Sequence, residues 1–157
     1  MEKIQLLVID VDGTLTDGKI YMSANGELMK AFNAKDGYAI VHFLPTLNII
    51  PVIITGRSSD ILLARCKELK ITEIYQGVSN KINKLKEICE QKNIPLNNVA
   101  YIGDDVNDLD CMNACGIKAC PSDAVPEIVS VCDFVSTKKG GDGAVREFID
   151  YIKNNIN

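Results

Sequence analysis

The chain has 157 residues, a formal net charge of −4, and 46% hydrophobic residues. This length fits a single domain over residues 1–157 with one buried core. The acidic balance argues against nucleic acid or an anionic membrane as a partner. Because no apolar run is long enough to span a membrane and the N-terminus lacks the layout of a signal peptide, a cytoplasmic location is expected.

The first predicted strand ends in two carboxylates. An apolar run over 4–9 leads into Asp10-Val11-Asp12-Gly13-Thr14, which is typical of a buried strand in a parallel sheet, where ligands bind beyond the carboxyl ends. Asp10 and Asp12 can face one site, and their repulsion indicates a hard cation such as Mg²⁺. The alternative is an ordinary turn that closes the strand. The segment 10–16 resembles the first motif of the haloacid dehalogenase (HAD) superfamily of phosphohydrolases.

A β-hairpin is predicted directly after this motif. Two β-prone segments, 18–22 and 27–32, flank Ser23-Ala24-Asn25-Gly26, and Asn-Gly is a strong hairpin signal. Its apolar side chains are Tyr21, Met22, Met29 and Phe32. They are too apolar for a lone flap in water, so another subunit is expected to cover them.

Strands and helices then alternate along the chain. A helix should run from Asp36, a possible N-cap, toward Leu47, with Pro45 kinking or ending it. Further strands are predicted at 49–54, about 74–75, 99–102, 117–119 and 134–135, and further helices at 60–69, 82–89, 126–131 and 144–153. This order predicts an α/β fold of the Rossmann type, with a mostly parallel sheet, helices on both faces and no separate cap domain.

The polar turns after these strands should meet at one edge of the sheet and supply the groups that phosphoryl transfer needs. Asp10 would attack phosphorus, and Asp12 would protonate the leaving alkoxide and later deprotonate water. Thr55 and the amide of Gly56 can donate hydrogen bonds to phosphoryl oxygens. Lys81, at a predicted helix start, supplies positive charge. Six cysteines without paired spacing are expected to be reduced.

A second acidic cluster follows the strand at 99–102 and completes the predicted metal site. Asp104 should ligate Mg²⁺ together with Asp10 and the backbone carbonyl of Asp12. Asp105 is a second candidate ligand, whereas Asp108 is expected to anchor the ligands from behind. Acids crowded at one buried strand end are unfavourable without a cation, which argues against a merely solvated loop.

Basic residues near these turns are candidates for binding a second anionic group of the substrate, such as a carboxylate. Arg57 is the best placed, because a guanidinium can bind a carboxylate through two parallel hydrogen bonds. Lys35, Lys138 and Lys139 lie in loops that could come from a neighbouring subunit. The alternative for Arg57 is an exposed residue at the start of a helix.

The resemblance extends over nearly the whole chain, because Asp10/Asp12, Thr55, Lys81 and Asp104/Asp108 match the four HAD motifs in order. Without a cap and with a hairpin after the first motif, the chain resembles the 3-deoxy-D-manno-octulosonate 8-phosphate phosphatase family and its relatives acting on nine-carbon sugar acids. The resemblance implies a Mg²⁺-dependent phosphatase for a 2-keto-3-deoxy sugar-acid phosphate. It also implies an aspartyl-phosphate intermediate and a homotetramer whose subunits help to close each other's sites.

Two alternatives stay open at this point. Arg57 after Thr55-Gly56 favours the octulosonate branch, whereas Asn107 resembles the sialic-acid side, which acts on N-acylneuraminate or related nine-carbon 9-phosphates. The chain could also be a tetramerisation domain of the kind attached to sialic-acid cytidylyltransferases. The intact acidic set favours the enzyme, since a structural module has no reason to keep a costly acidic cluster.

Overall fold

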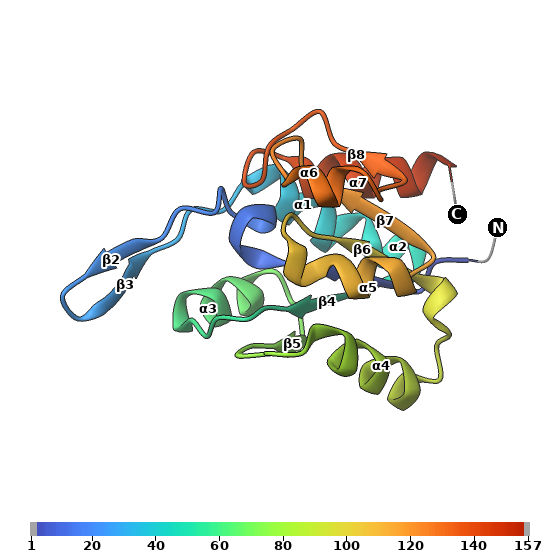
Figure 1. Ribbon diagram of the computed structural model, residues 1–157, viewed down its shortest axis with the longest axis horizontal. Helices are drawn as coiled ribbons and strands as arrows, with labels where there is room; N and C mark the ends of the chain where they lie inside the picture. Colours follow the sequence, from blue (N-terminus) through green and yellow to red (C-terminus); the bar gives the residue numbers. More distant parts are fainter. Residues whose placement is uncertain (1–2, 156–157) are drawn as a thin grey trace.

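Strand β1 (Leu6–Ile9) lies inside a six-stranded sheet in the computed structural model, which describes residues 3–155 (Figure 1). The strand order is β5-β4-β1-β6-β7-β8, and every neighbouring pair is parallel. The other strands are β4 (Ile50–Ile54), β5 (Glu73–Tyr75), β6 (Val99–Ile102), β7 (Ile117–Cys120) and β8 (Phe134–Val135). The predicted parallel α/β sheet is therefore confirmed.

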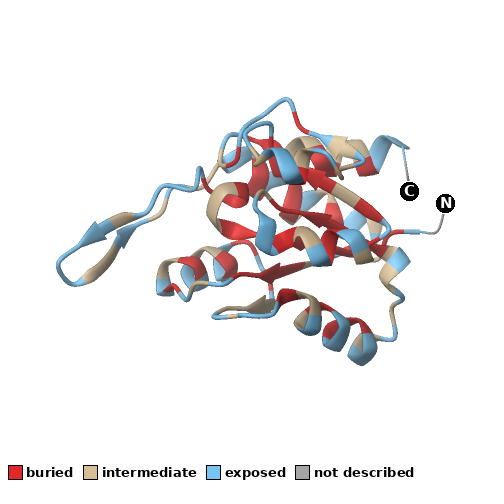
Figure 2. Cartoon of the chain, viewed as in Figure 1, coloured by how far each residue is buried: buried red, intermediate tan, exposed pale blue. Residues whose placement is uncertain are grey.

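Helices cover both faces of this sheet. The first face is covered by α1 (Ala34–His42), α2 (Leu44–Leu47), α3 (Asp60–Glu68) and α7 (Ala144–Asn155), and the second by α4 (Lys81–Lys92), α5 (Leu109–Ala114) and α6 (Pro126–Val129). Short helical turns lie at η1 (Val11–Leu15), η2 (Leu96–Asn98) and η3 (Val106–Asp108). Leu7 and Ile9 of β1 pack on the first face, and Leu6 and Val8 on the second, which explains the uninterrupted apolar run. Figure 2 shows this buried centre.

The predicted hairpin is present and projects from the body (Figure 1). Strands β2 (Tyr21–Ser23) and β3 (Gly26–Met29) pair antiparallel. Met22 and Leu28 are 58% and 61% exposed in the single chain. Within residues 3–155 the hairpin is the one pair of strands outside the main sheet, and no separate cap domain accompanies it.

The N-cap predicted for the helix after the hairpin is wrong by three residues. Helix α1 begins at Ala34, and Asn33 is its N-cap, whose side chain accepts a hydrogen bond from the Lys35 amide at 2.8 Å. Asp36 lies within the helix and instead accepts a hydrogen bond from the Arg146 amide at the start of α7, also at 2.8 Å. Its carboxylate caps a different helix from the one that contains it.

Two further features describe the chain as a whole. No helix among residues 3–155 combines the length and the apolar character that crossing a bilayer requires. All six cysteines, which fall within these residues, are free thiols.

Candidate active site

Three carboxylates gather where β1 and β6 end. Asp10 follows β1, Asp104 follows β6, and Asp108 lies one helical turn farther on; single oxygen atoms of the three lie within 4.8 Å of one another. Gly13, at φ +93°, permits this approach, because a β-carbon there would lie 2.0 Å from Oδ2 of Asp104. The hydroxyl of Thr14 donates to Oδ1 of Asp104 at 3.1 Å and fixes that carboxylate.

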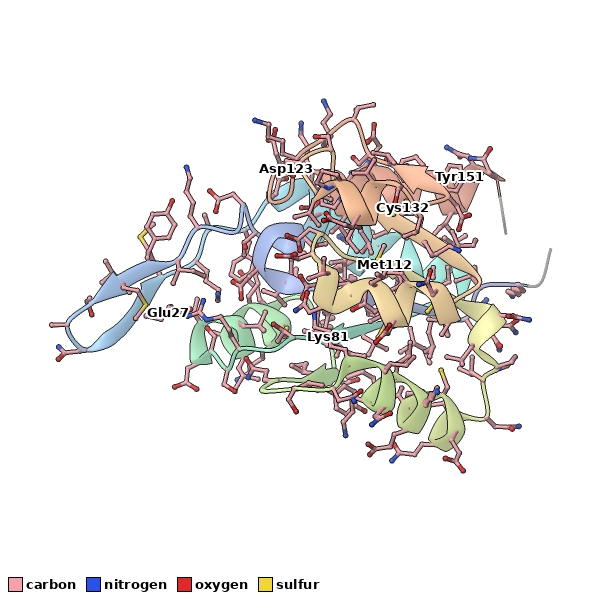
Figure 3. The ribbon with its side chains drawn as sticks, in the orientation of Figure 1. Glu27, Lys81, Met112, Asp123, Cys132 and Tyr151 are labelled. Atoms are coloured by element: carbon pink, nitrogen blue, oxygen red, sulfur yellow. The ribbon has the colours of Figure 1, made fainter. Side chains whose placement is uncertain are left out.

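Lys81, the first residue of α4, brings positive charge into the cluster (Figure 3). Its side chain is 3% exposed, and Nζ donates to Oδ1 of Asp10 at 2.7 Å and to Oδ1 of Asp108 at 2.8 Å. Burial lowers the pKa of Lys81, but the charges of Asp10 and Asp108 outweigh this and raise it above its ordinary value. Lys81 therefore remains a cation.

Asp108 acts as an anchor for its neighbours. Its Oδ1 accepts hydrogen bonds from Lys81 and from the Tyr101 hydroxyl at 2.6 Å. Its Oδ2 accepts from the amides of Asp104 and Asp105 at 3.1 and 3.3 Å. Four donors thus occupy a carboxylate that is completely buried, so it holds Lys81 and the loop that carries Asp104 in place.

The remaining acids fit a magnesium ion. Burial, the repulsion of Asp108 and that of Asp104 raise the pKa of Asp10 well above its ordinary value, against the opposing effect of Lys81. Burial, with repulsion from Asp108 and Asp105, raises the pKa of Asp104 to about 6. These shifts indicate a site with too little positive charge for its carboxylates. Asp10 and Asp104 supply the hard oxygen ligands that Mg²⁺ prefers, and Mg²⁺ bound there would offset the charge of the carboxylates and of a phosphoryl group.

Asp105 lies differently from the other acids. It is exposed, and its Oδ1 accepts from the Val106 amide at 2.7 Å, so it caps its own turn. It lines the cavity but is not among the three acids whose oxygens converge. Direct ligation by Asp105, and by the backbone carbonyl of Asp12, stays a prediction.

Asp12 faces a different cation from Asp10. The backbone at Asp12 is extended, with φ −72° and ψ 113° inside the η1 turn, and its side chain is 21% exposed. Its Oδ1 accepts from Nζ of Lys30 at 2.7 Å, and Nη1 of Arg57 lies 3.8 Å from Oδ2. Each carboxylate of the first motif therefore has its own lysine, Lys81 for Asp10 and Lys30 for Asp12.

A cavity of about 210 Å³ joins these groups. Its lining consists of Asp10, Asp12, Thr55, Gly56, Arg57, Asp104, Asp105 and Asn107. Most of the predicted site residues thus border one space. Lys35 and Lys138 are exposed and do not line it within one chain, so their predicted contact with the substrate depends on a neighbouring subunit.

The sequence-based prediction missed Lys30, Glu27 and Ser59. Glu27 binds Lys30 at 3.2 Å and Nη2 of Arg57 at 3.3 Å, and it accepts a hydrogen bond from the Ser59 hydroxyl at 2.5 Å. The opposite charges of Glu27 and Lys30, three residues apart in an otherwise apolar hairpin, were a signal that could have identified these two residues. Nη1 of Arg57 is buried and lacks a hydrogen-bond partner among the described residues.

Known proteins share this sequence and arrangement. Residues 65–149 match the family described as haloacid dehalogenase-like hydrolase. The 3-deoxy-D-manno-octulosonate 8-phosphate phosphatase of Escherichia coli is 46% identical over 151 residues, which cover 96% of this chain and 80% of that enzyme.

Two crystal structures extend the comparison. The corresponding phosphatase from Yersinia pestis superimposes with a TM-score of 0.91 at 44% identity, covering 95% of this chain and 80% of that one. The enzyme from Moraxella catarrhalis, in complex with magnesium, phosphate and 3-deoxy-D-manno-octulosonate (KDO), has a TM-score of 0.90 at 40% identity, covering 95% and 85%. The chain therefore belongs to the 3-deoxy-D-manno-octulosonate 8-phosphate phosphatase family of haloacid dehalogenase-like hydrolases.

Proposed function

We propose that this chain is a Mg²⁺-dependent phosphatase that hydrolyses KDO 8-phosphate through an aspartyl-phosphate on Asp10. The observation that carries the proposal is that Asp10, which Lys81 contacts at 2.7 Å, converges with Asp104 in a cavity that Thr55 and Arg57 also line. The enzymes named above act on this substrate, and they share the fold and nearly half of the sequence.

In the first half-reaction a carboxylate oxygen of Asp10 attacks phosphorus, and the bond from phosphorus to the sugar oxygen breaks. Asp12 gives its proton to the departing oxygen. Lys81 favours the ionised form of Asp10 and holds its carboxylate in place, and Thr55 with the Gly56 amide would donate to the phosphoryl oxygens.

The second half-reaction reverses the role of Asp12. Its carboxylate, now deprotonated, takes a proton from water as the water oxygen attacks phosphorus. The bond from phosphorus to Asp10 breaks, inorganic phosphate leaves, and Asp12 is again protonated for the next substrate. The partly exposed side chain of Asp12, which lines the cavity, suits a group that must meet both the sugar oxygen and water.

Arg57 is the proposed recognition group for the sugar-acid carboxylate. Arg57 lines the cavity, and its Nη1 has no hydrogen-bond partner among the described residues, so it can donate to a substrate oxygen without breaking an existing hydrogen bond. Arg57→Ala should reduce the preference for KDO 8-phosphate over a neutral sugar phosphate by roughly 2 kcal/mol, the scale of a hydrogen bond to a charged group. Arg57→Lys keeps the charge and is the matched control. Equal losses on both substrates would assign Arg57 to the phosphate or to the fold.

A substrate panel tests the function itself. Phosphate release should be fastest from KDO 8-phosphate, slower from N-acylneuraminate 9-phosphate and slowest from a neutral hexose 6-phosphate, and it should stop when Mg²⁺ is chelated. Preference for the nine-carbon substrate would move the chain to the sialic-acid branch. Absence of turnover on every phosphate monoester would instead favour a role as a tetramerisation domain.

The proposal includes a cytoplasmic homotetramer of this single domain. The free cysteines suit a reducing compartment. The hairpin exposes Ile20, Met22, Leu28 and Met29, each at least 44% exposed, and a second subunit would bury them. Light scattering should give four times the mass of the chain, and Leu28→Asp should lower that mass. An active monomer at micromolar concentration would refute the assembly.

A further inference from the structure

The base of the hairpin carries a lysine that points into the site. Lys30 directly follows β3, and its side chain is 3% exposed although its neighbours Met29 and Ala31 are exposed. Lysine side chains are rarely buried unless they are paired. Here Nζ has two acidic partners, Asp12 at 2.7 Å and Glu27 at 3.2 Å.

Glu27 fixes this lysine from behind. It lies in β3 on the side of the hairpin that faces α3 (Figure 3), and its side chain is 15% exposed. Its oxygens also contact Nη2 of Arg57 at 3.3 Å and the hydroxyl of Ser59, the N-cap of α3. The position of Lys30 is therefore set by an element of the main body as well as by the hairpin.

The carboxylate of Asp12 depends on this contact. Lys30 is its hydrogen-bond donor in the described part of the chain, because Arg57 lies 3.8 Å away, beyond hydrogen-bond distance. The side chain of Asp12 is 21% exposed, against 7% for Asp10, so packing restrains Asp12 less than it restrains Asp10. A group that transfers protons must be held within hydrogen-bond reach of the reacting oxygen.

We propose that Lys30 is a positioning residue that, held by Glu27, orients the Asp12 carboxylate for proton transfer. The hairpin then has a role within its own chain, in addition to any role in assembly. This inference rests on the proposed phosphatase activity. It assigns Lys30 to the step in which the sugar oxygen leaves, whereas Lys81 serves the attacking carboxylate.

Comparing substrates with different leaving groups can distinguish a role of Lys30 through Asp12 from a structural role or a substrate contact. An alkyl oxygen, as in a sugar phosphate, needs a proton as it departs, whereas p-nitrophenolate leaves without one. If Lys30 acts through Asp12, Lys30→Met should lower kcat on alkyl phosphates by about tenfold or more, since misplacing a reacting group by an ångström costs up to about a hundredfold. The kcat on p-nitrophenyl phosphate should fall less than about threefold, and KM should change little on both.

The matched variants are Lys30→Arg, which keeps the charge and should recover part of the rate, and Lys19→Met, which removes an exposed lysine of the same arm and should leave both rates unchanged. In the Asp12→Asn background, Lys30→Met should cause no further loss on alkyl phosphates, because its effect passes through Asp12. Melting curves with Mg²⁺ compare the folding of all variants.

Several results would overturn the inference. Equal losses on both leaving groups would indicate a structural role, a raised KM alone would indicate a substrate contact, and an additive loss in the Asp12→Asn background would exclude action through Asp12. If wild type rejects KDO 8-phosphate yet hydrolyses other alkyl phosphates, only the sugar-acid assignment fails and the same comparison tests Lys30. If wild type hydrolyses no phosphate ester, both proposals fall.

Discussion

Replacing Lys81 by methionine should strongly destabilise the metal-free protein. Lys81 is 3% exposed and forms ion pairs of 2.7 Å with Asp10 and 2.8 Å with Asp108, whose side chains are 7% and 0% exposed. The substitution keeps an unbranched side chain that is one atom shorter, but it leaves two buried carboxylates without their cation. Breaking a buried pair of this kind costs about 3–5 kcal/mol. At about 2–4 °C per kcal/mol for a chain of this size, the melting temperature at pH 8 should fall by roughly 10 °C.

The loss of stability caused by Lys81→Met should grow as the pH rises. A carboxyl whose pKa is higher in the folded state than in the unfolded state contributes stability at low pH and loses it as pH rises through the folded value. Burial already raises the pKa of Asp10 well above its ordinary 3.8 and that of Asp104 to about 6. Loss of Lys81 removes the opposing charge from Asp10. The difference in melting temperature between Lys81→Met and wild type should therefore widen as pH rises from 5 to 8.

Melting curves in chelator and in Mg²⁺ provide the assay. Mg²⁺ should narrow the gap, because a cation bound by Asp10 and Asp104 replaces part of the lost charge and binds only the folded state. Lys84→Met, one turn farther along α4 and paired with Glu87 at the surface, should change the melting temperature by no more than about 2 °C. A loss of stability below about 1 kcal/mol for Lys81→Met, or a loss that changes with neither pH nor Mg²⁺, would refute the electrostatic account.

Three further predictions concern other parts of the fold. Asp10→Asn should abolish phosphate release yet melt no lower than wild type in chelator, since it removes a buried charge; near-normal turnover would exclude Asp10 as nucleophile. Gly140→Ala places a β-carbon 1.9 Å from the carbonyl oxygen of Gly13 and should cost about 1–3 kcal/mol and most of the activity, which melting and turnover measure; a wild-type result would contradict that packing. Burial raises the pKa of Asp36 to about 6, so wild type should lose stability as pH rises from 5 to 8, whereas Asp36→Asn should not. The free energy of unfolding of Asp36→Asn, measured in denaturant titrations, should therefore rise relative to that of wild type by roughly 1–2 kcal/mol over this range. A difference that stays constant with pH would contradict the pKa shift.

The edge that carries the candidate site could be predicted from the sequence because the topology is simple. In a parallel sheet every strand ends at the same edge, so acids after two buried apolar runs must lie close together if those strands are neighbours. Strands β1 and β6 pair directly, with Ile9 opposite Ile102, and this register places Asp10 near Asp104. Lys81 could be placed by the same reasoning, because it is the first residue of α4. This helix follows β5, which lies beside β4 in the same sheet.

Partners distant along the chain could not be predicted in this way. Asp36 looked like an N-cap because it precedes an apolar helical run, but Asn33 had the extended backbone that a cap needs. The carboxylate of Asp36 serves the Arg146 amide 110 residues away, and no local pattern contains that information. Helix α7 packs against α1, and this tertiary contact decides which helix Asp36 caps.

The hairpin shows why a correct element can hide a functional contact. Two β-prone segments and Asn-Gly predicted its strands, and its apolar side chains directed attention to assembly. Where a charged side chain at the base of such an arm points depends on how the strands bend back over the body, which side-chain periodicity does not specify. Glu27 fixes the position of the hairpin relative to the body, because its contacts with Ser59 and Arg57 connect β3 to the segment at the start of α3. Variants at Leu28 and at Lys30 should therefore separate assembly from proton transfer, since Leu28 is exposed in the single chain whereas Lys30 contacts Asp12.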